Sequence, residues 1–129
     1  MARSPTPRPT DAELAILRVL WRHGPSTVRA VCNVLNRDRP TGYTTALKLI
    51  QIMFDKGLVT RDDSEQSHVY SVRHSEQHTQ RLLVRDLLDR AFGGSARKLI
   101  LGALSARQVS PDDLSEIRKL LDRMEGVNP

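Results

Sequence analysis

The chain has 129 residues, of which 39% are hydrophobic and 27% are charged, and its net charge is +5 with an isoelectric point near 10.0. This length allows one ordinary domain, or a small domain with an oligomerisation arm. No apolar run approaches the roughly 20 residues that a membrane-spanning helix needs, and Cys32 is the only cysteine. We therefore expect a cytoplasmic protein, with no membrane segment and no disulfide framework.

Residues 1–9 are predicted to form a disordered lead to the first domain. They contain Arg3, Arg8 and three prolines, and they lack the apolar middle segment of a signal peptide. We therefore expect that the chain is not secreted.

Positive charge is concentrated in the first half of the chain. Eight basic and two acidic residues lie from Arg18 to Arg61, whereas nine basic and eight acidic residues lie from Glu76 to the C-terminus. A basic region of this kind favours a polyanionic partner, and nucleic acid is the first candidate.

Two short helices are predicted at the start of residues 10–75. Thr10 and Glu13 have the spacing of a capping box, and Leu14, Leu17, Leu20 and Trp21 form an apolar face that ends before Gly24-Pro25. Ser26 is expected to cap a second helix, in which Val28, Val31, Cys32 and Leu35 share one side. Pro40 and Gly42 then indicate a turn over residues 36–42.

A third helix is predicted over residues 43–56, with Gly57 as its left-handed C-terminal cap. Two strand-like runs follow at residues 58–61 and 69–72, joined by the polar segment 62–67, which is the pattern of a hairpin or wing. Three helices followed by a hairpin predict a winged helix-turn-helix over residues 10–75. The expected fold class is mainly α.

Residues 76–129 show only helical periodicity, broken at Gly93-Gly94 and at residues 107–110. We expect three helices, and the last has Ser110 as a cap and Pro111 in its first turn. Such short helices cannot bury a sizeable core alone, so they are predicted to be a dimerisation arm, with an intrachain helical cap as the alternative. The apolar residues expected at the dimer interface are Leu83, Leu87, Phe92, Leu99, Leu114, Ile117, Leu121 and Met124.

The third helix has one apolar face and one polar face. Ala46, Leu49, Ile50 and Met53 share the apolar face, and the opposite face offers hydrogen-bonding side chains and a cation of the kind that read base edges and phosphates. The residues predicted to contact double-stranded DNA are Thr41, Tyr43, Thr44, Thr45, Lys48 and Gln51, with Arg29 on the second helix and Arg61 and His68 on the wing.

Catalytic and metal-binding patterns are weak in this sequence. His74 and His78 are spaced i, i+4 and could hold a metal from one helix face, but no further ligand is evident nearby. Gly93-Gly94 lies between helices and is typical of a hinge, not of a phosphate loop. We expect no enzymatic activity, no cofactor and no metal site.

Short motifs spread over nearly the whole chain after Pro9 resemble those of the penicillinase-repressor family, the relatives of BlaI, MecI and CopY. The individual motifs are short, but their order and spacing together are specific. They are Thr10-Asp11-Ala12-Glu13-Leu14 with Leu17 and Leu20-Trp21, then Tyr43-Thr44-Thr45-Ala46, Lys56-Gly57-Leu58-Val59, Tyr70, and Phe92-Gly93-Gly94-Ser95.

The resemblance implies a winged helix that binds inverted-repeat operators, a dimerising helical arm and repression of neighbouring genes. It also implies that a sensor-protease pathway could relieve repression by cleaving the C-terminal region, as in β-lactam resistance. Two departures limit the transfer. The chain has no cysteine after Cys32, so the copper-sensing cluster of one branch is absent, and Ile52 stands where many relatives carry arginine.

Two other functions remain open on the sequence. The winged helix could bind an acidic protein partner in place of DNA, because the fold alone does not separate these functions. The chain could also be a ligand-responsive regulator with a pocket between the arm and the winged helix.

Overall fold

The structure is a computed structural model that describes residues 8–126, which contain six helices and one two-stranded hairpin. Residues 1–7 of the predicted N-terminal lead lie outside the described residues. None of the helices in the described part combines the length and the apolar character needed to cross a bilayer. Two compact units divide the chain, one up to Val84 and one from Arg85.

The first unit begins with α1 (Asp11–His23), α2 (Val28–Leu35) and α3 (Tyr43–Lys56). The predicted capping box is confirmed, since Glu13 N–H donates to Thr10 Oγ1 and Thr10 N–H donates to Glu13 Oε1. Gly57 ends α3 with φ of 82°, the left-handed conformation that glycine adopts without a Cβ penalty.

The hairpin pairs β1 (Val59–Asp62) with β2 (Val69–Val72) in antiparallel register, with Val59 opposite Val72 and Arg61 opposite Tyr70. Ser26 adds a bridge to the second strand through Ser26 N–H to Tyr70 O at 3.0 Å and Tyr70 N–H to Ser26 O at 2.8 Å. The prediction that Ser26 caps α2 is therefore wrong. Thr27 is the cap, and its hydroxyl accepts from Ala30 N–H.

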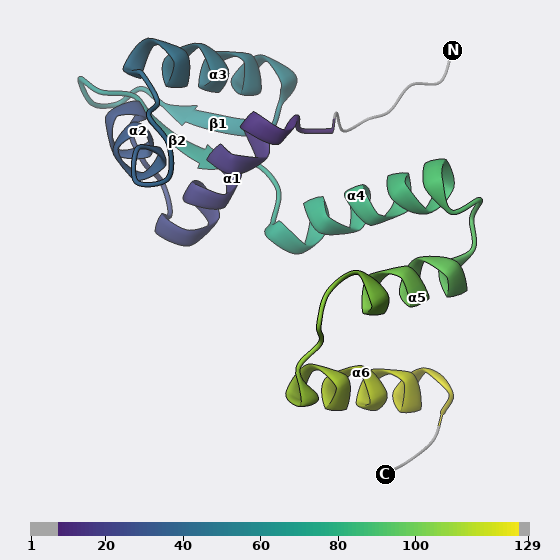
Figure 1. Cartoon of the computed structure of the whole chain (residues 1–129). Helices are drawn as coiled ribbons and strands as arrows, with labels where there is room; N and C mark the ends of the chain where they lie inside the picture. The colour runs from purple at the N-terminus through teal and green to yellow at the C-terminus, as the bar shows by residue number, and fades with distance from the viewer. Residues whose placement is uncertain (1–7, 127–129) are drawn as a thin grey trace, which may run out of the picture. The chain divides into compact units, whose positions relative to one another are not determined.

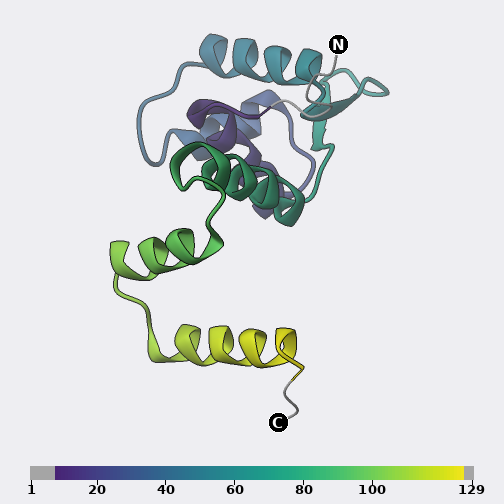
Figure 2. The same ribbon diagram turned by 90° about the vertical axis from the view of Figure 1, so that its right-hand side faces the viewer.

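The core of the first unit lies between α1, α2, α3 and the hairpin. Its most deeply buried side chains are Ile16, Val31, Ile50, Met53, Val59 and Tyr70. In α1, Leu17 and Leu20 are buried as predicted, but Leu14 and Trp21 are only half-buried. Ile16 and Val19 are buried in addition, so the buried face is rotated from the predicted one. Figures 1 and 2 show that α1, α2 and the hairpin all lie on one side of α3, which leaves its other side open.

The remaining helices are α4 (Glu76–Ala91), α5 (Ala96–Ala106) and α6 (Pro111–Met124), as predicted for the C-terminal half. Thr79 is buried, and the first unit extends through the first half of α4 to Val84. Gly93 and Gly94 both have positive φ, and Ser95 then caps α5. Ser110 caps α6 with Pro111 at its start, as the sequence predicts.

Candidate nucleic-acid interface

The polar face of α3 is the surface on which the predicted DNA contacts gather. Thr44, Thr45, Lys48 and Gln51 are all exposed, whereas Ala46, Ile50 and Met53 are buried on the opposite face. Leu49 is half-buried, so it borders the core and does not belong to its centre. The face therefore combines two hydroxyls, one amide and one ammonium group along a single helix, with nothing from the first unit packed over them.

The N-terminal end of α3 is also open. Gly42 precedes it and offers no side chain to cap the first amide groups. Each of the other five helices in the described residues starts behind a Ser or Thr whose hydroxyl accepts a backbone N–H; these are Thr10, Thr27, Ser75, Ser95 and Ser110. Free N–H groups and the positive end of the helix dipole both favour a phosphate at this point.

Tyr43 and Arg29 flank the start of α3. The guanidinium of Arg29 lies 4.5 Å from the centre of the Tyr43 ring, and Tyr43 is 40% exposed. This cation–π contact connects α2 to α3, and Arg29 remains exposed on the surface. The structure thus brings both predicted residues to one place beside the open end of α3.

Thr41 lies in the turn before α3 and is held by three hydrogen bonds. Its N–H donates to Asn36 Oδ1 at 2.6 Å, its hydroxyl donates to Arg39 O, and its carbonyl accepts from Cys32 Sγ at 3.2 Å. Asn36 was not singled out in the sequence, although asparagine just after a helix commonly forms such turn contacts. These bonds fix the path of the chain into α3.

Arg61 and His68 on the wing share one carboxylate. Arg61 Nε lies 2.8 Å from Asp63 Oδ1, and His68 Nδ1 lies 2.6 Å from the same oxygen. The Arg61 guanidinium also stacks over the Phe54 ring at 4.5 Å. A side-chain hydrogen bond with Tyr70, followed by the charge of Asp63, holds the pKa of Arg61 above its usual value. Both predicted wing residues are therefore engaged within the chain.

The wing loop is acidic as well as exposed. Asp63 and Glu65 lie in it, next to Asp62 at the end of β1. The Asp62 carboxylate accepts from Ser64 N–H at 2.9 Å, which lowers the pKa of Asp62. Asp63 was not among the residues predicted from the sequence. The sequence shows two adjacent aspartates after Arg61, which suggests an ion pair. That Asp63 contacts both Arg61 and His68 depends on how the hairpin turns.

Glu13 on α1 and Lys56 on α3 form a salt bridge. Lys56 Nζ lies 2.7 Å from Glu13 Oε1, and the Glu13 side chain is 3% exposed. The pair connects the first turn of α1 to the last turn of α3. It fixes the C-terminal end of α3 against α1, at the opposite end of the helix from Thr44.

His74 and His78 lie near the start of α4. Their rings stack with centroids 4.6 Å apart, and the described residues contain no group of three or more potential metal ligands. Burial, then the charges of His78 and Arg73, lowers the pKa of His74. The His74 carbonyl accepts from Trp21 Nε1, which ties α1 to the segment that leads into α4.

The predicted dimerisation residues are only partly covered within one chain. Leu87, Leu121 and Met124 are 46%, 48% and 75% exposed. Five others are half-buried; these are Leu83, Phe92, Leu99, Leu114 and Ile117. Neither α5 nor α6 contains any buried residue.

Three helices, the hairpin and the open polar face of α3 define a winged helix-turn-helix. The chain belongs to the penicillinase-repressor family, because the family model described as penicillinase repressor matches residues 9–123. This finding confirms the resemblance read from the sequence.

Two relatives and one solved structure illustrate the similarity. The transcriptional regulator BlaI of Mycobacterium tuberculosis is 30% identical over 116 residues, which cover 89% of this chain and 83% of that protein. The penicillinase repressor of Bacillus licheniformis is 22% identical over 116 residues, covering 90% and 91%. The crystal structure of transcriptional regulator Tm0710 from Thermotoga maritima aligns with a TM-score of 0.49 and 16% identity, covering 91% of this chain and 74% of that chain.

Proposed function

We propose that the protein is a homodimeric repressor that binds an inverted-repeat operator in double-stranded DNA. In this proposal α3 enters the major groove, Thr44, Thr45 and Gln51 face base edges, and Lys48 faces a base or a phosphate. The single observation that carries the proposal is the open face of α3, with its uncapped start at Gly42. The names of the relatives, which include a penicillinase repressor and the methicillin resistance regulatory protein MecI, support the same function.

The positions of Arg29 and of the wing suggest different contributions to binding. Arg29 lies beside the start of α3 and is proposed to contact a phosphate. Arg61 and His68 contribute less than the sequence suggests, because both side chains already contact the Asp63 carboxylate. The wing therefore acts mainly as a support for α3 through the contact of Arg61 with Phe54.

Dimerisation is proposed to occur through the helical arm. The support is that α5 and α6 bury no residue within one chain, although they carry Leu121, Met124 and other large apolar side chains. Exposed apolar surface of this kind marks an interface, and a second copy of the chain would present the same faces. Two copies of α3 would then reach successive major grooves, since one half-site alone binds too weakly to compete with genomic DNA.

Relief of repression is proposed to follow cleavage of the arm by a sensor or protease, within the cytoplasm. Loss of the dimer would separate the two copies of α3 and weaken operator binding by orders of magnitude. Exposing cells to a β-lactam and following the chain by immunoblotting tests this route. A shortened chain that appears before the target transcript rises supports it, and a target transcript that rises while the chain stays intact contradicts it.

Fluorescence anisotropy with the DNA upstream of the gene for this protein tests the main proposal. We expect sequence-dependent binding that weakens steeply as salt rises, with a two-fold symmetric protected site in footprinting. A scrambled duplex of the same composition is the control. Equal affinity for the two duplexes would contradict operator recognition and favour an acidic protein as the partner.

A further inference from the structure

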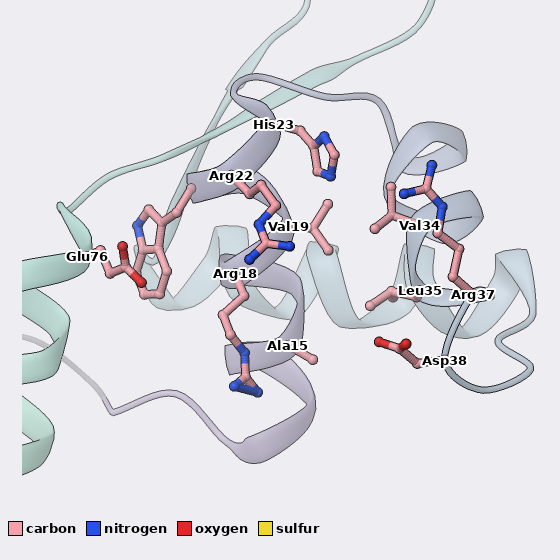
Figure 3. A pocket seen from close by; sticks show the side chains of 11 residues that line it. Ala15, Arg18, Val19, Arg22, His23, Val34, Leu35, Arg37, Asp38 and Glu76 are labelled. Carbon is pink, nitrogen blue, oxygen red and sulfur yellow. The ribbon is translucent and has the colours of Figure 1, made fainter. Parts of the chain in front are cut away.

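A groove of about 620 Å³ lies between α1 and α2, within the first unit and outside the proposed DNA interface. Its walls are α1 and the end of α2 with the turn that follows, and the first residue of α4, Glu76, lies at its edge (Figure 3). The volume falls within the range of small-molecule sites. We define this feature, lined by Val19, Trp21, Leu35 and the arginines described below, as the α1/α2 groove.

The floor of the α1/α2 groove is apolar. Ala15 and Val19 line it from α1, and Val34 and Leu35 line it from α2. Val19 is buried and the other three are half-buried, so the floor is continuous with the core but still reached by solvent. The indole of Trp21 also lines the groove. An apolar molecule placed here would remove this surface from water.

The rim of the groove is basic. Figure 3 shows Arg18 and Arg22 projecting from α1, and Arg37 on the facing wall beyond the end of α2. Within residues 8–126 none of these three guanidinium groups forms an ion pair or a side-chain hydrogen bond with the protein. Asp38 and Glu76 also lie on the rim, so the excess of positive charge is small.

The groove faces away from the polar side of α3. Buried residues of α1, including Ile16 and Leu17, pack into the core that α3 also contacts, while Arg18 and Arg22 are exposed on another face of α1. In Figure 3, α3 lies behind the helices that carry the groove. The arginines on this rim are therefore not explained by contact of α3 with DNA.

We propose that the α1/α2 groove binds an organic anion with an apolar body and a single carboxylate or similar group. The guanidinium groups of Arg18 and Arg22 hold the charged end, because arginine matches carboxylate oxygens in a paired geometry. The hydrocarbon body lies on Val19, Val34 and Leu35. Asp38 and Glu76 favour one negative charge over several, which directs the site toward monoanions and away from polyphosphates.

Trp21 provides a direct reporter of occupancy. It is the only tryptophan in the chain, it lines the groove, and its Nε1 donates to His74 O at 3.1 Å. Its fluorescence therefore changes when a ligand covers the indole, and this readout does not depend on DNA. Failure of operator binding and failure of this site are thus separate results.

The test is a titration of the full-length protein with 4-phenylbutyrate, followed by Trp21 fluorescence. We expect a saturable change, with no saturation by 4-phenylbutylammonium, acetate or inorganic phosphate at the same concentrations. Arg22→Gln should weaken binding about tenfold, the loss of one charge-assisted hydrogen bond. The control is Arg118→Gln, an exposed arginine on α6, which should leave the affinity unchanged.

Three results would overturn the proposal. If 4-phenylbutylammonium binds as tightly as 4-phenylbutyrate, the arginines do not select the ligand. If phosphate or acetate binds as tightly as 4-phenylbutyrate, the apolar floor does not contribute to binding. Saturation by polyglutamate but not by 4-phenylbutyrate would assign the groove to an acidic protein segment. Because Arg22 is exposed, the variant should fold, and circular dichroism checks this before titration.

Discussion

Lys48 is the cation on the open face of α3. If it meets a phosphate, Lys48→Ala should weaken binding to operator and to scrambled DNA alike, and it should lower the salt slope by about one. Anisotropy titrations at several salt concentrations measure both quantities. Lys98→Ala, on α5, is the control for loss of one charge, and unchanged affinity and slope in Lys48→Ala would remove Lys48 from the contact set.

Asp63 contacts both Arg61 and His68 on the wing. Asp63→Asn should free Arg61 and His68, so we expect affinity for scrambled DNA to rise about threefold and the salt slope to steepen by roughly one. Glu65→Gln removes the same charge from the same loop without releasing an ion pair in the described residues. Equal effects of the two substitutions would show that only net charge matters here.

At the residue scale, the sequence predicted which residues of α3 are exposed, because helical periodicity alone determines which side chains share a face. It did not predict the shared contact of Arg61 and His68, since that contact depends on how the six-residue loop 63–68 folds back on itself. The arginines around the α1/α2 groove were not predicted as one site either, because Arg37 lies far from Arg18 in the sequence and the two line the same groove only once α1 packs against α2.

The pairing of α1 with α3 depends on Glu13 and Lys56. Lys56→Met would leave the Glu13 carboxylate buried without its ammonium partner, so the free energy of unfolding should fall by about 2 kcal/mol. Urea denaturation measures the change. Lys119→Met removes an exposed pair with Glu116 and should stay within about 0.5 kcal/mol of the wild type. Equal losses would contradict a bracing role for the Glu13–Lys56 pair.

His74, which precedes α4, should make the free energy of unfolding depend on pH. Burial lowers the pKa of folded His74, so as pH falls through the ordinary value of 6.5 the unfolded chain takes up this proton before the folded chain does. The free energy of unfolding should therefore decrease below that pH and level off once folded His74 is protonated. His74→Asn should flatten this slope in urea titrations, whereas Gln77→Ala, in the first turn of α4, should keep it.

At the element scale, the order of helices and strands followed from caps, turns and periodicity. Thr10, Gly57 and Ser110 signal their helix ends through local geometry, and the structure confirms each. Ser26 does not cap α2, because its backbone N–H and carbonyl are hydrogen-bonded to Tyr70 in a long-range bridge. Local signals could not separate Ser26 from Thr27, since both residues are good caps and only the hairpin decides between them.

At the scale of the whole molecule, α5 and α6 carry apolar side chains that are not buried within one chain. Periodicity predicted apolar stripes on α5 and α6, and the structure leaves Leu120 and Leu121 about half exposed. A sequence cannot show whether such a stripe meets its own chain or another. The absence of buried residues in these two helices favours a second copy, because this amount of apolar surface is costly in water.

Leu121→Glu tests that arrangement in the full chain. Leu121 is 48% exposed within one chain, so a charge there should leave the monomer folded but place an unpaired carboxylate inside a dimer interface. We expect monomers in sedimentation and operator affinity at least about a hundredfold weaker, since two linked half-sites become one. Arg118→Glu introduces the same carboxylate at a polar position of α6. A Leu121→Glu protein that remains dimeric would move the interface away from α6, and a monomer with full affinity would separate dimerisation from operator binding.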